Sequence, residues 1–226
     1  MGTVNSDTSH NQPLEGAIKD VVEADNNIRE NVRRITLNAL SDGKLDLDEI
    51  SQVTRLVVNG AGVGAVIYGP DGRNPLAKAV EGLNDALCTA AEASKLAIEE
   101  ACSHVNTFGK QDLLHAINDL NELETMYLET LNDVAKETSE TVSETLNDLV
   151  RHGRLSGTAI GQKASETAKL LNEQLSERLS ETVSAGVDSA SKVTSNLAYA
   201  AAGFLEAIAQ TLDKKLTSKS SENAHK

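Results

Sequence analysis

The side chains that most often perform catalysis or bind metal ions are few in this chain. It has five histidines and two cysteines, and Cys102 and His104 fall on different faces of an expected helix, which is poor geometry for a metal. His115 and Asp119 stand four residues apart, the spacing of a base with an orienting carboxylate but also of an ordinary exposed helix pair. No nucleophile elbow and no pair of Glu-x-x-His motifs accompanies them. We therefore expect no enzymatic activity and no cofactor.

A stretch of oxygen-bearing side chains after Ser41 resembles the second half of an EF-hand calcium loop. If Gly43 is taken as loop position 6, Asp42 occupies position 5 and Glu49 position 12. The first half departs from the motif, because Asn38 and Leu40 stand where oxygen ligands are needed. We expect a turn and a helix N-cap instead, with Asp46 and Glu49 forming a capping box. The alternative is a weak calcium site with three carboxylate ligands: Asp42, Asp46 and Glu49.

The segment Gly60-Ala-Gly62-Val-Gly64-Ala matches the spacing of a dinucleotide-binding turn. The context does not fit, because such a turn lies between a strand and a helix and is followed by a second strand, whereas residues 75–107 have a helical pattern. The glycines are better explained by helix packing. They form two ridges of small residues four apart, which let helix backbones approach closely: Gly60 and Gly64, then Gly153, Gly157 and Gly161. These are predicted close-contact surfaces, and one arrangement pairs the two ridges with each other.

The elements that carry these residues are expected to be long amphipathic helices. No proline follows Pro75, and apolar residues recur three or four positions apart over most of the remaining chain. Only 2% of residues are aromatic, so the core must be built from Leu, Val, Ile and Ala. The pattern predicts five helices, over residues 13–40, 46–67, 75–107, 110–152 and from 153–158 to 216.

The expected fold is all-α, an elongated antiparallel bundle of about five helices in which the last two form a long hairpin. Short connections between helices favour antiparallel neighbours. We expect residues 1–12 to be a disordered arm, residues 13–216 to form a single domain, and residues 217–226 to be a disordered tail.

The charge of the chain narrows the classes of partner. A net charge of −13 repels phosphate backbones and anionic membranes, so nucleic-acid binding is not expected. The first residues lack the basic and apolar regions of a signal peptide, and the longest uncharged run, residues 56–70, is too short to span a bilayer. These features predict a cytoplasmic protein.

In pattern alone the chain is similar to granule-coating phasins and exchangeable apolipoproteins, which are built of long amphipathic helices. This likeness rests on helical period and composition and assigns no residue a role. We expect a non-enzymatic structural or interaction protein that binds itself, a partner protein or an apolar surface. The candidate face lies in the least charged part of the last helix: Leu197, Ala201, Phe204 and Ile208. The main alternative is a membrane-active bundle of the pore-forming type, with Leu56–Ile67 as the inserting segment.

Overall fold

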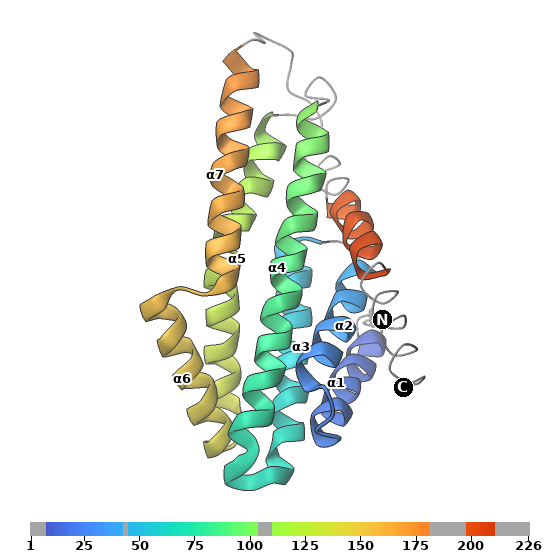
Figure 1. Ribbon diagram of the computed structural model, residues 1–226, viewed down its shortest axis with the longest axis vertical. Coiled ribbons are helices and arrows are strands. Elements are labelled where there is room, and N and C mark those ends of the chain that lie inside the picture. The colour runs from blue at the N-terminus through green and yellow to red at the C-terminus, as the bar shows by residue number, and fades with distance from the viewer. Residues whose placement is uncertain (1–7, 43–44, 104–109, 181–197, 211–226) are drawn as a thin grey trace, which may run out of the picture.

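The computed structural model describes residues 8–42, 45–103, 110–180 and 198–210, and they form an elongated bundle of helices (Figure 1). The prediction of an all-α bundle is confirmed, since the described residues contain no strand. The helices run alternately down and up the long axis as far as α6, and α7 continues upward from α6 (Figure 1). Their bounds are α1 Thr8–Glu23, α2 Ile28–Ser41, α3 Leu47–Ala65, η1 Val66–Gly72, α4 Arg73–Ser103, α5 Lys110–Glu137, α6 Glu140–Ser156 and α7 Ala159–Ser180. Residues 198–210 form a further helix.

The first predicted helix is two helices joined by a tight corner. The apolar repeat continues from Ile18 to Val32, but the backbone turns between them, where Asp25 and Asn27 adopt left-handed conformations with φ of 45° and 49°. Asp and Asn tolerate that conformation better than most other residues. Helices α1 and α2 therefore run antiparallel (Figure 1). Helix α1 also begins at Thr8, within the segment expected to be an arm, and residues 1–7 lie outside the described residues.

The predicted fourth helix is likewise broken, between α5 and α6. Thr138 and Ser139 leave the helical conformation, and Ser139 has the extended φ and ψ of −63° and 158° at the N-cap position of α6. The long hairpin therefore turns at residues 138–139 rather than near residues 153–158. Its second arm is α6 followed by α7, which pack in turn against the lower and upper parts of α5 (Figure 1). Of the expected fifth helix, residues 181–197 and 211–216 lie outside the described residues, as does the expected tail.

One continuous core joins the described helices. Its largest fully buried side chains come from α1, α2, α4, α5, α6 and α7: Ile18, Leu40, Leu76, Leu83, Leu87, Ile98, Leu113, Ile117, Leu123, Leu131, Leu146 and Ile160. Because their apolar stripes face one another, these helices bury their apolar side chains against each other within one chain. That arrangement supplies most of the stability of long helices.

Candidate functional site

A short helix, residues 198–210, is docked on the side of the bundle near the start of α3 (Figure 1). It is joined to the chain outside it by a backbone hydrogen bond in which the Leu45 N–H donates to the Ala198 carbonyl at 3.1 Å. Its buried residues are nearly all small, and Leu205 is the one large side chain that is fully buried. The inner face consists of Ala198, Ala201, Ala202, Leu205 and Ala209.

The predicted interaction face therefore packs against the helix bundle of the same chain. It is rotated slightly about the helix axis from the residues that are fully buried. Ala201 is buried, whereas Phe204 and Ile208 are partly buried at the edge of the core. Leu197 lies outside the described residues. Tyr199 points outward and is 56% exposed.

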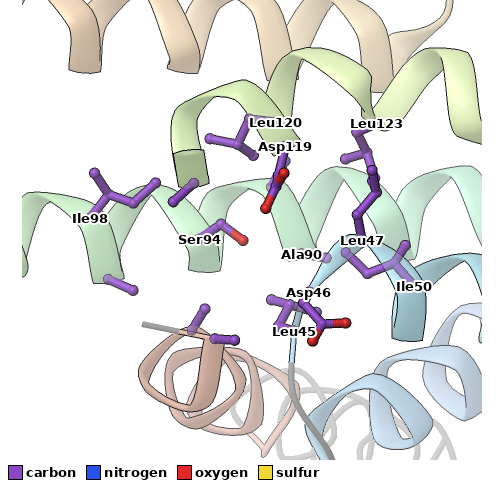
Figure 2. A pocket seen from close by; sticks show the side chains of 15 residues that line it. Leu45, Asp46, Leu47, Ile50, Ala90, Ser94, Ile98, Asp119, Leu120 and Leu123 are labelled. Atoms are coloured by element: carbon purple, nitrogen blue, oxygen red, sulfur yellow. The ribbon is translucent and has the colours of Figure 1, made fainter. Parts of the chain in front are cut away.

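Beneath this helix lies a small pocket, which we call the seat (Figure 2). It has a volume of about 60 Å³ and is bounded by α3, α4, α5 and the 198–210 helix. Alanines line it from both sides, including Ala90 and Ala97 of α4, Ala116 of α5, and Ala201 of the docked helix. A void of this size has room for a few water molecules or for part of a larger side chain. Within the part of the chain that the structure describes, the docked helix thus leaves its seat incompletely filled.

Two carboxylates border the seat, and the pKa of one of them is raised there. Asp119 of α5 directs its side chain into the pocket, and Asp46 lies across from it at the start of α3 (Figure 2). Burial raises the pKa of Asp119, and the charges of Glu122, Asp46 and Asp48 raise it further, against an opposing effect of His115. We call the two lining carboxylates, together with the two further carboxylates that act on Asp119, the acidic rim: Asp46, Asp48, Asp119 and Glu122.

The carboxylates considered for calcium have structural surroundings. The Asp46 side chain accepts a hydrogen bond from the Glu49 N–H at 3.0 Å and caps α3 in an extended conformation. The predicted N-cap is therefore present. Asp42 ends α2 as its C-cap, and Gly43 lies outside the described residues. Among the residues that the structure describes, no group of three or more His, Cys, Asp or Glu side chains could hold a metal ion.

The first glycine ridge lies where α3 crosses α1. A Cβ added to Gly60 would overlap the Glu15 carbonyl oxygen, and one added to Gly64 would lie 2.7 Å from the Lys19 carbonyl oxygen. Both obstacles are backbone atoms of α1, so the two helices could not keep this separation with alanine on α3. The ridge faces α1 and does not meet the second ridge.

The second set of glycines forms the corner between α6 and α7. Gly157 has a φ of 75°, which favours glycine, and its N–H bonds to the Gly153 carbonyl to end α6. Gly153 makes room for Leu128 of α5, whose Cδ2 would lie 2.8 Å from an added Cβ. Gly161 makes room for the carboxylate of Glu124. Each glycine has its own local reason, and they do not form one continuous surface.

A second exposed feature is the apolar tip, which consists of the last turn of α3 and the start of η1. Three large apolar side chains there are substantially exposed: Val63 by 48%, Val66 by 54% and Ile67 by 60%. The tip is fixed in place, because the Tyr68 hydroxyl lies 2.8 Å from the Glu23 carbonyl oxygen. By length and composition one stretch of the described chain, Leu47–Ala101, contains a window apolar enough to cross a membrane, and 56% of that window is buried.

The seat could not be found by reading the sequence. Its lining comes from four elements that are far apart in the chain, and alanines in a helical pattern have no distinctive spacing. In the sequence, Asp119 is distinguished only by its spacing of four from His115. The one available signal was the replacement of leucine by alanine along residues 76–101, which indicates close approach by a neighbour.

Comparison with known protein families places most of the chain in one family model. A family model described as a family of unknown function (DUF6781) matches residues 5–214. No curated protein and no solved structure matches the chain.

Proposed function

The chain belongs to this family of unknown function, DUF6781, and we propose that it is a non-enzymatic interaction protein that binds an amphipathic helix of a partner protein. The partner helix would occupy the seat that the 198–210 helix now covers. The observation that carries this proposal is the incomplete filling of the seat, which leaves a pocket of about 60 Å³ between alanines.

The packing of the docked helix supports its replacement. Well-packed interiors leave few voids, and each unfilled volume costs dispersion energy at its walls. A helix with leucine or methionine in the position of Ala201 would fill the space that alanine leaves. Such a helix would gain contacts that the 198–210 helix lacks, and recognition of a helix in an apolar groove is a common mode of protein association.

The attachment of the docked helix supports the same conclusion. Residues 198–210 make a short helix, and isolated helices of this length are marginal in water. Its inner face buries one large side chain, Leu205, beside four alanines. The energy that holds it in the seat is therefore small compared with that of α4 or α5, whose stripes contain several buried leucines.

The test is to weaken the docking of the 198–210 helix without changing the residues of α3, α4 and α5 that line the seat. Leu205→Asn places a polar amide at the centre of the buried face, and Ala200→Asn makes the matched change on the exposed face of the same helix. The probe is a fluorescent amphipathic peptide of leucine and glutamine, about 18 residues or five turns long. We expect Leu205→Asn to bind it at least roughly tenfold more tightly than wild type or Ala200→Asn. Equal binding by all three proteins would show that the seat is not the binding site.

The apolar tip favours a second candidate function, a membrane-active bundle. Its basis is the exposure of Val63, Val66 and Ile67 at the end of the predicted inserting segment, Leu56–Ile67. In the same segment Val57 and Val58 are buried, so insertion of the whole segment would require α3 to leave the core. Release of dye from zwitterionic lipid vesicles by wild type, and its loss in Val63→Asp, would favour this function. No release by wild type would exclude it.

A further inference from the structure

The acidic rim has no cation supplied by the helix that covers the seat. Residues 198–210 carry one charged side chain, Glu206, which has the same sign as the rim. The charges that act most strongly on the Asp119 carboxyl are three carboxylates and one histidine. Among the residues that the structure describes, the docked helix therefore brings no positive charge to this edge.

We propose that the partner helix is basic, with lysine or arginine flanking its apolar face so that these cations lie against the acidic rim when the helix occupies the seat. This rests on the proposed function, since it names the chemistry of the helix that binds there. The apolar side of the partner fills the space between the alanines, and the cations pair with Asp119 and with the carboxylates on α3.

The geometry of the rim suits one helix crossing the seat. Asp46 caps the start of α3, and Asp119 of α5 lies across the pocket from it (Figure 2). Asp48 follows in the first turn of α3, and Glu122 is three residues after Asp119 on α5. Acidic groups thus stand on both sides of an apolar floor. An amphipathic helix presents the same order of groups, with an apolar stripe between two polar borders. Complementary charge of this kind raises the association rate and selects among partners.

Two peptides separate this inference from the proposed function. One is the leucine–glutamine peptide described above, and the other has lysine in place of every glutamine. In the full-length Leu205→Asn protein we expect the lysine peptide to bind at least roughly tenfold more tightly than the leucine–glutamine peptide. This difference in affinity should shrink several-fold between about 0.05 and 0.5 M salt. If neither peptide responds to Leu205→Asn, the proposed function fails. If both bind equally well to the opened seat, the function stands and the basic partner is wrong.

General attraction of a cationic peptide to an acidic protein is the main competing explanation, and charge removal at two places distinguishes it. The rim variant adds Asp48→Asn and Asp119→Asn to the opened protein, whereas the control variant adds Glu129→Gln and Glu173→Gln on exposed positions of α5 and α7. We expect the rim variant to lose most of the lysine advantage and the control to keep it. An equal loss in both variants would overturn the inference.

Discussion

The carboxylate of Glu124 in α5 occupies the space where a side chain on Gly161 of α7 would begin. Its Oε1 accepts hydrogen bonds from both the N–H and the hydroxyl of Thr158, each at 2.7 Å. The Thr158 hydroxyl in turn accepts from the Gly161 N–H at 2.9 Å, which caps the start of α7. The Glu124 carboxylate thus holds the corner between α6 and α7 in place.

Gly161→Ala should destabilise the protein, although alanine in a helix is ordinarily better than glycine by about 1 kcal/mol. The added methyl displaces Glu124 and breaks its bonds to Thr158, at a cost of about 1–3 kcal/mol. Chemical denaturation of Gly161→Ala, Glu124→Ala and the double variant checks this. In the Glu124→Ala background the same glycine change should become stabilising, and a destabilisation of equal size there would show that the carboxylate is not the obstacle.

Gly60→Ala should lower stability by about 1–3 kcal/mol, because the new methyl meets the backbone carbonyl of Glu15 and must push α1 away from α3. The matched control is Gly203→Ala, in the 198–210 helix, where an added Cβ meets nothing within 4 Å. That change should be neutral or stabilising by up to about 1 kcal/mol. Similar melting temperatures for the two variants would contradict the close crossing of α1 and α3.

Asp119→Asn should stabilise the free protein at neutral pH. The pKa of Asp119 is raised above its ordinary value of 3.8, so the ionised carboxylate is less favourable in the folded protein than in the unfolded chain. This penalty is present when the group is ionised in both states and disappears as the pH falls below 3.8. Thermal melts between pH 7 and pH 3 should show a gap between variant and wild type that closes with acidification. A gap that is constant with pH would show that its origin is not the charge.

The Cys88 thiol should react slowly in the native protein. Burial, together with nearby Asp85, raises its pKa to about 11, so at pH 8 only about 0.1% is thiolate, the reactive form. In a Cys102→Ser variant, which isolates Cys88, alkylation by iodoacetamide at pH 8 should be at least roughly thirtyfold slower in the native than in the unfolded chain. Equal rates would mean that Cys88 is not held in its half-buried position.

The helical content of this chain was predictable, and the corners were not. The apolar stripe resumes in helical register after each corner, at Ile28 and at Val142, so periodicity alone joins α1 to α2 and α5 to α6. The signals that end these helices are local and short. Asp25 and Asn27 accept left-handed conformations, and Ser139 takes an N-cap conformation. Such residues also occur within exposed helix faces, where they break nothing.

The glycines show the same limit in another way. Their spacing of four residues predicted a close approach of another helix, because that spacing places them on one face of a helix. The spacing did not identify which helix or side chain approaches each glycine. Gly60 and Gly64 face carbonyl groups of α1, whereas Gly161 faces a carboxylate of α5. The identity of a neighbour depends on the order in which helices stack, and that order follows from the corners that periodicity missed.

The most direct test of the central claim is amide hydrogen exchange of the full-length protein with and without the leucine–lysine peptide at saturating concentration. If the peptide takes the place of the 198–210 helix, exchange in residues 198–210 should become faster, while amides lining the seat in α4 and α5 stay as protected as before or become more so. Binding of the peptide with unchanged protection of residues 198–210 would contradict the claim that this helix covers the binding site.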